Sequence, residues 1–290
     1  MPDESWATLA DAYVDGAYAT VKGRVRTYVL HEQLIRHLPK PPATVLDVGG
    51  GAAHQLLPLA RLGYEVTVLD PSEAMLAKAE QRLTAEPEEV RRRVRLIQAR
   101  GENARKAVDG ETFNAVLCHG VLMYLPEPRA MLESLCRCVA SGGLVSVMAL
   151  NRQTLAVGPA LEHLWTDALR AFDATGEVGV LGTETRADTV EELSGLMRQG
   201  QVDPVAWYGV WLFVDWLDLP LESTDVPAVA AVELQASTRD PYRQFSRVFH
   251  LVGRRREVPP RPPKALALEV RPSASLRGRP AVDGPDGMDD

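Results

Sequence analysis

The sequence is short of cysteine, of net positive charge and of long apolar runs. Its three cysteines, Cys118, Cys136 and Cys138, are odd in number and have no histidine at metal-ligand spacing, so we expect buried free thiols and no metal site. A net charge of -7 gives no general attraction for nucleic acid, whose binding depends largely on Lys and Arg. No run of about 18 apolar residues occurs, and the chain begins with acidic and polar residues, so neither a membrane span nor a signal peptide is predicted. We therefore expect a cytoplasmic globular protein.

Short apolar segments alternate with amphipathic ones through the first half of the chain. With 46% hydrophobic residues the chain can bury one substantial core. The predicted strands are residues 44–48, 65–70, 94–99, 113–120 and 143–150, with helical segments between them. Such alternation is typical of right-handed βαβ units, so we expect an α/β fold whose mostly parallel sheet has helices on both faces. Ser72 is expected to cap the helix that follows it, and Gly63 to end the preceding one.

The segments on either side predict the rest of the organisation. Residues 1–42 contain helical spacing and are expected to form N-terminal helices, and residues 43–256 the main domain. Within it, residues 151–188 have a weak pattern and are interpreted as a variable insertion over the site. Strand candidates follow at 205–216 and 245–255, with a helix-like segment near 225–237. Residues 257–290 hold seven of the 21 prolines and are predicted to be a disordered tail.

The most informative motif is the turn that follows the first predicted strand. Its glycines are Gly49, Gly50 and Gly51. Glycine tolerates unusual backbone angles and allows a ligand to approach the main chain, which makes this turn a candidate nucleotide-binding loop. His54 stands where the dinucleotide fingerprint G-x-G-x-x-G has its third glycine, so the motif disfavours a nicotinamide cofactor.

Two carboxylates near this turn favour S-adenosylmethionine (SAM). Asp47 lies two residues before the first glycine, where an acid can help to hold the cationic methionine end of SAM. Asp70 closes the next strand, 19 residues after Gly51, where a carboxylate can accept hydrogen bonds from both ribose hydroxyls. The alternative for each is a loop cap, but the two together predict a SAM site.

Further candidates follow the third and fourth predicted strands. Gly101 and Glu102 come after the third strand, and Glu102 can accept a hydrogen bond from the adenine amino group. His119 follows the fourth strand, at the carboxyl edge where open α/β sheets bind ligands, although it can instead be a satisfied loop histidine. A hydroxyl acceptor would need a catalytic base within about 3 Å, and His119 and Tyr124 are the candidates.

Several stretches resemble class I SAM-dependent methyltransferases, and within them the bacterial tRNA 5-carboxymethoxyuridine methyltransferases. The likeness covers roughly residues 13–256, and the main stretches that carry it are 18–26, 46–51, 118–122 and 141–148. It implies a Rossmann-like fold with a seven-stranded, mostly parallel sheet, an antiparallel last strand and N-terminal helices over the cofactor site. It also implies that Arg26 reaches the carboxylate of the methionine moiety. The residues implied around the rest of SAM are Gly50, Gly51, Asp70, Gly101, Glu102 and His119.

The chain departs from these relatives where the acceptor would bind. Residues 177–184 replace a lysine-rich stretch, and Trp211 stands in place of an arginine. The lost positive charge disfavours tRNA, so the first hypothesis is O-methylation of a small molecule, with a carboxylate as an acceptor that needs no base. The alternatives are methylation of a tRNA wobble-uridine carboxymethoxy group and a SAM-binding protein without catalysis. The oligomeric state is left open.

Overall fold

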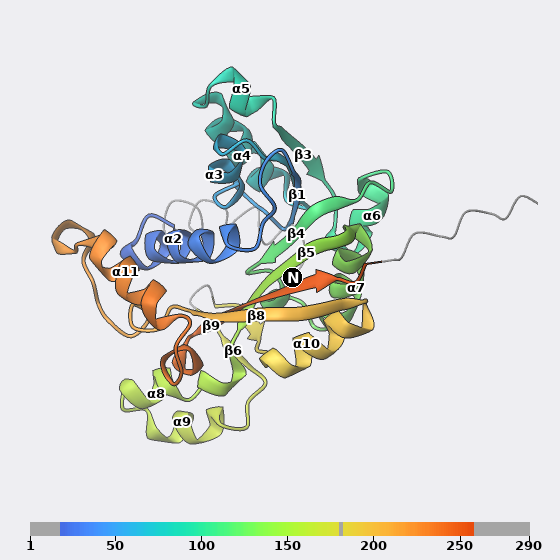
Figure 1. The fold of residues 1–290 in the computed structure, drawn as a ribbon. Coiled ribbons are helices and arrows are strands. Elements are labelled where there is room, and N and C mark those ends of the chain that lie inside the picture. Colours follow the sequence, from blue (N-terminus) through green and yellow to red (C-terminus); the bar gives the residue numbers. More distant parts are fainter. Residues whose placement is uncertain (1–17, 180–181, 258–290) are drawn as a thin grey trace, which may run out of the picture. The chain divides into compact units, whose positions relative to one another are not determined.

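The computed structural model describes residues 18–179 and 182–257, and its main element is a seven-stranded sheet (Figure 1). The strands of this sheet are β1 Thr44–Val48, β2 Glu65–Asp70, β3 Val94–Gln98, β4 Phe113–His119, β5 Val139–Leu150, β8 Val202–Val210 and β9 Val248–Arg255. They are ordered β3-β2-β1-β4-β5-β9-β8, and only β9 runs antiparallel to its neighbours. The α/β fold with a mostly parallel sheet and an antiparallel last strand is confirmed.

One face of the sheet is covered by helices from the first half of the chain. These are α2 Val21–Ile35, α3 Leu56–Arg61, α4 Glu73–Thr84 and the short α5 Glu88–Arg91. Their buried side chains, such as Leu34, Leu56 and Ala79, pack against Val66 and Leu117 of the strands. Burying apolar area of this kind is the main favourable contribution to folding.

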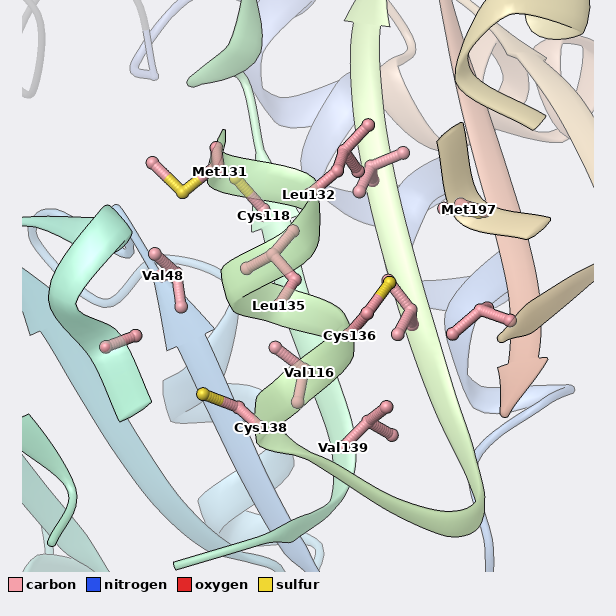
Figure 2. Close-up of a cluster of buried hydrophobic side chains, with 14 of the residues drawn as sticks. Val48, Val116, Cys118, Met131, Leu132, Leu135, Cys136, Cys138, Val139 and Met197 are labelled. Atoms are coloured by element: carbon pink, nitrogen blue, oxygen red, sulfur yellow. The ribbon is translucent and has the colours of Figure 1, made fainter. Parts of the chain in front are cut away.

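The opposite face is covered by α6 Ala104–Ala107, α7 Arg129–Cys138 and α10 Val190–Gln199. Figure 2 shows the centre of this layer, where Leu135 and Cys136 of α7 lie over Val116 of β4, with Met197 of α10 beside them. Cys118, Cys136 and Cys138 are buried free thiols, as predicted. Burial raises the pKa of Cys136 to about 11, so this thiol stays protonated and serves as a packing group.

Local sequence signals fix several helix ends. The Ser72 hydroxyl accepts the backbone N–H of Met75 and caps α4, as predicted. Gly63 follows α3 with a φ of +98°, a value that glycine adopts without strain. Thr189 and Glu192 form a capping box at the start of α10. These helix ends thus depend on a few residues next to them in the sequence.

The segment after β5 contains its own small elements. They are α8 Val157–Leu161, α9 Trp165–Ala171 and the hairpin strands β6 Gly176–Val178 and β7 Glu184–Arg186. His163 has a φ of +63° and separates the two helices. The predicted strand 205–216 is instead β8, which starts earlier and ends at Val210. It ends there because Trp211 has a φ of +59°, which takes the chain out of the sheet.

The region after β8 is held by a helix, as the helix-like spacing near 225–237 predicts. This helix, α11 Val226–Ala236, buries the carboxylate of Glu233 completely. Glu233 accepts the backbone N–H groups of Leu212, Phe213 and Val214 at 2.9, 2.6 and 2.8 Å. One carboxylate thus fixes the loop that carries Trp211.

Two sequence predictions lie outside the described residues. These are the first N-terminal helix, before residue 18, and the tail from residue 258 onward. Within residues 18–179 and 182–257, no helix is long and apolar enough to cross a membrane. In the same ranges, no three His, Cys, Asp or Glu side chains gather into a group that could hold a metal ion.

Candidate cofactor and acceptor site

The glycine turn after β1 leaves no room for side chains. Gly49 and Gly51 have φ values of +74° and +51°. A Cβ on Gly50 would lie 2.8 Å from Oδ2 of Asp47, and one on Gly51 would lie 2.6 Å from Cε of Met75. The glycines are therefore required both by backbone conformation and by close contacts, and they expose the main chain at the carboxyl edge of the sheet.

Asp70, at the end of β2, organises the loop beside it. Its Oδ2 accepts the N–H of Gly51 at 2.9 Å, and its Oδ1 accepts the N–H of Ser72 at 2.9 Å. A carboxylate has about four acceptor positions, and Asp70 uses two of them to hold the backbone of this loop. Asp70 thus combines the loop-capping role with a position on the wall of a cavity.

Asp47 is buried beneath the same turn. Only 3% of its surface is exposed, and Oδ1 has no hydrogen-bond partner among the described residues. Burial, reinforced by the nearby Asp70, raises the pKa of Asp47 to about 7, although Arg26 acts in the opposite direction. A buried carboxylate with an unused oxygen is suited to a cationic donor.

These residues surround a cavity of about 120 Å³, which we call the glycine cavity. The candidates from the sequence that line it are Gly49, Gly50, Gly51, Asp70, Gly101, Glu102, His119 and Tyr124. Gly101 packs so closely that a Cβ there would meet Val48 at 2.6 Å. Four separate strand ends thus bring the predicted cofactor residues together, with Asp47 buried below.

A larger cavity of about 320 Å³, which we call the outer cavity, adjoins the first. Tyr18, Gly120 and Tyr124 line both. The apolar wall of the outer cavity is formed by Met123, Met148, Leu150, Trp211 and Val248. The hairpin β6–β7 contributes Glu177 and Thr185, so part of the predicted insertion does border the site.

The charges of the outer cavity come from three cations and two acids. Lys22, Arg26 and Arg247 line it, as does Glu177. Arg247 forms ion pairs with Glu177 and, at 3.6 Å, with Asp215, which also pairs with Lys22. Cations therefore exceed acids by one, which favours an anionic occupant.

Arg26 lies in the outer cavity, and it is absent from the lining of the glycine cavity. Its guanidinium lies 5.2 Å from the ring centre of Tyr18 and 5.9 Å from that of Trp211. The Trp211 indole N–H donates to the Lys22 carbonyl at 3.0 Å, and the Lys22 ammonium lies 4.5 Å from its ring. A role for Arg26 at the methionine carboxylate stays a prediction.

The two candidate bases have different surroundings. The pKa of His119 is well below its ordinary value because of burial and then of His250 and Arg26, so its imidazole is neutral. Burial raises the pKa of Tyr124, which keeps its phenol protonated at neutral pH. Tyr124 is thus placed to donate a hydrogen bond where the two cavities meet. His119 lines the glycine cavity and does not line the outer cavity.

Sequence reasoning missed the role of His54. Its ring stacks on Tyr18 with 3.8 Å between centres, and burial lowers its pKa to about 3, assisted by Arg82 and Arg26. His54 lines the glycine cavity. The only signal in the sequence was that His54 takes the place of the third glycine of the dinucleotide motif. This disfavoured a nicotinamide cofactor but did not indicate that His54 lines the cavity.

Comparison with known proteins identifies the domain. Residues 46–145 match the family model described as a methyltransferase domain. The tRNA 5-carboxymethoxyuridine methyltransferase of Escherichia coli strain K12 is 25% identical over 260 residues, which cover 88% of this chain and 97% of the relative. A ubiquinone biosynthesis O-methyltransferase of Methylobacterium nodulans is 32% identical over 120 residues, covering 40% of this chain and 45% of that protein.

A solved structure agrees with the fold. It is the SAM-dependent methyltransferase, possible histamine N-methyltransferase, of Thermotoga maritima, with a TM-score of 0.57 at 16% identity, covering 87% of this chain and 99% of that one. Residues 46–145 thus match a methyltransferase domain, and the chain is similar to a tRNA methyltransferase over most of its length. These matches support methyl transfer as the activity and SAM as the cofactor, and they disfavour a binding protein without catalysis.

The glycine cavity of this methyltransferase fits its cofactor. The unused Oδ1 of buried Asp47 suits the ammonium of the methionine end. Asp70 lies on the cavity wall, where a carboxylate is a suitable acceptor for hydroxyl groups, and any Cβ on Gly50 would fill the space above Asp47. These observations support the assignments of Asp47, Gly50 and Asp70, which remain predictions until binding is measured.

Proposed function

We propose that this methyltransferase transfers a methyl group from SAM to an oxygen atom of a small molecule bound in the outer cavity, and that a carboxylate is the preferred acceptor. The observation that carries the proposal is the outer cavity itself, which adjoins the glycine cavity at Gly120 and Tyr124. Its apolar wall and excess of cations suit an anion with an apolar body.

SAM, when bound, would supply an electrophilic methyl group: the O–CH3 bond to the acceptor forms in line as the S–CH3 bond breaks, and the sulfur keeps the electron pair as the neutral thioether of S-adenosylhomocysteine. The residues of this chain position the acceptor and exclude water, and those two effects supply much of the acceleration. Lys22 and Arg247 are held by Asp215 and Glu177, so a carboxylate is attracted by the excess of one positive charge that these residues and Arg26 together leave at the cavity, while Trp211 and Met148 pack against its apolar part. A carboxylate needs no base, which agrees with the raised pKa of Tyr124 and the neutral His119.

Methylation of a tRNA wobble-uridine carboxymethoxy group is the second candidate. It is supported by the similarity to the E. coli tRNA enzyme over 97% of that protein's length. Against it stand the net charge of -7 and the position of Trp211 in the outer cavity. The two candidates share a carboxylate oxygen as acceptor and differ in the size and charge of the rest of the substrate.

The experiment uses SAM with a labelled methyl group and two pools of acceptors, fractionated small molecules and total tRNA. We expect label in a small molecule, released by mild base as from a methyl ester. Label in tRNA alone, with binding that falls steeply as salt rises, would establish the second candidate instead. Arg247→Gln, which removes a cavity cation, is expected to raise KM for an anionic acceptor while SAM affinity is retained.

A further inference from the structure

A chain of hydrogen bonds between buried side chains crosses the sheet from His119 to helix α2. His119 Nε2 lies 2.8 Å from Oγ of Ser146, and this Oγ lies 2.7 Å from Nε2 of His250. His250 Nδ1 lies 2.9 Å from Oε1 of Gln33, whose amide Nε2 donates to the Gly209 carbonyl at 3.1 Å. The chain therefore links β4, β5, β9 and α2, neighbouring elements in Figure 1.

These hydrogen-bonded polar side chains lie in a part of the core that is otherwise apolar, where apolar residues would be less costly to bury. Ser146, His250 and Gln33 are each fully buried, at 0% exposure. Leu117, Leu144 and Val252 belong to the hydrophobic core on this face. Burying polar groups costs free energy unless every group is hydrogen-bonded, so a network here must be nearly complete to be tolerated.

The direction of every proton in the chain follows from its far end. The Gly209 carbonyl can only accept, so Gln33 donates there through Nε2 and presents Oε1 to His250. His250 must then donate from Nδ1, and its neutral ring accepts at Nε2 from the Ser146 hydroxyl. Ser146 has donated its proton in this bond, so it accepts from Nε2–H of His119.

The series of hydrogen bonds ends at His119, and this order of donors and acceptors leaves one nitrogen of its ring without a partner. His119 Nδ1 is buried and has no hydrogen-bond partner among the described residues. With the proton on Nε2, Nδ1 presents a lone pair. His119 lines the glycine cavity, so its ring forms part of the wall of the cofactor site.

We propose that Ser146, His250 and Gln33 are positioning residues that fix His119 as the Nε2–H tautomer, so that its Nδ1 accepts a hydrogen bond from an N–H or O–H donor of the bound cofactor. The assignment rests on the proposed function only for the identity of that donor. The tautomer is a property of the protein without ligand.

Burial and the neighbouring charges keep the imidazoles of His250 and His119 neutral. Burial lowers the pKa of His250 to about 3, with a smaller effect from His37. His119 is lowered by burial, by His250 and by Arg26, so a second proton on either ring is disfavoured at physiological pH. A protonated His119 would lose its acceptor and place a cation beside Arg26. Neutrality and a single tautomer together make His119 a hydrogen-bond acceptor.

The test is NMR of ¹⁵N-histidine-labelled protein without ligand, with the six histidines resolved by single substitutions. We expect His119 protonated only at Nε2 and His250 only at Nδ1. Ser146→Ala breaks the chain at its centre with little change of volume, so His119 should lose its single tautomer, whereas His250, still held by Gln33, should keep its proton on Nδ1. Ser194→Ala is the control, since Ser194 is buried, with 5% of its surface exposed, in α10 on the opposite face of the sheet.

Calorimetry with SAM on the same proteins gives the second result. We expect Ser146→Ala to weaken SAM binding about three- to tenfold, the effect of one misoriented hydrogen bond, and Ser194→Ala to leave it unchanged. A proton on Nδ1 of wild-type His119, or an unchanged His119 tautomer in Ser146→Ala, would overturn the proposal. Altered tautomers with unchanged affinity would overturn the positioning role. A wild-type protein that binds no SAM would refute the proposed function, whereas the ligand-free spectra would still decide the tautomer.

Discussion

Replacing Asp47 by Asn removes a charge whose state should be coupled to the cofactor. Without ligand the pKa of Asp47 is about 7, because burial and Asp70 outweigh Arg26. An ammonium close to Asp47 favours the charged carboxylate and lowers this pKa. SAM should therefore bind with release of a proton below pH 7, and its affinity should rise with pH between 5.5 and 7.

The magnitude follows from the size of the shift. A return of the pKa from about 7 to the ordinary 3.8 is about three units, or roughly 4 kcal/mol as an upper limit at about 1.4 kcal/mol per unit. Relaxation of the site reduces this to about 1–3 kcal/mol. We expect Asp47→Asn to weaken SAM binding about 10- to 100-fold at pH 7.5 and much less at pH 5.5.

The assay is titration calorimetry in two buffers of different ionisation enthalpy, which counts the released protons. 5′-Methylthioadenosine is the matched control, because it lacks the methionine end and should bind without an Asp47-linked proton. Asp47→Asn should also stabilise the ligand-free protein above pH 7, since a raised folded pKa favours folding at low pH and the benefit is lost as pH rises through 7. Equal affinity of the variant at both pH values, with no proton release by wild type, would refute the coupling.

Three further predictions concern the loop, α11 and the buried histidines. Gly50→Ala should weaken SAM binding at least tenfold, because the added Cβ would meet Asp47. Gly195→Ala is the control: its Cβ would enter open space in α10, so SAM affinity should be kept and the free energy of unfolding should rise by about 0.5–1 kcal/mol. Glu233→Gln should lower the free energy of unfolding by about 2–3 kcal/mol in urea titrations, because an amide accepts three N–H groups poorly; the exposed Glu222→Gln should change it little. Stability should fall as pH drops from 6.5 towards 4, since the unfolded state protonates His250 at about 6.5 and the folded state only near 3, and His250→Gln should flatten that slope.

The parts of the fold that sequence predicted are those with local causes. The strand β1, the glycine turn and the Ser72 cap each depend on a few adjacent residues, and the structure has them where expected. Asp70 is predictable because a carboxylate at a strand end has few other roles. The end of β8 was not predictable, since it depends on the conformation of Trp211 and on a carboxylate 21 residues away.

The parts that sequence could not supply depend on distant contacts. His250 meets Gln33 across 217 residues, so no spacing rule could connect them to His119. The pairing of Arg247 with Glu177 likewise required the hairpin to be placed against β9. Arg26 was assigned to the cofactor by resemblance, and only the structure shows that it lines the outer cavity.

The central claim is that the glycine cavity holds SAM through the carboxylates at the ends of β1 and β2. Equilibrium binding of SAM to wild type and to Asp70→Ala tests it most directly, with circular dichroism to confirm that the variant folds. Asp70→Asn, which keeps one acceptor oxygen for the loop, separates loop support from cofactor contact. The account predicts at least tenfold weaker binding in both folded variants; unchanged affinity in either would contradict it.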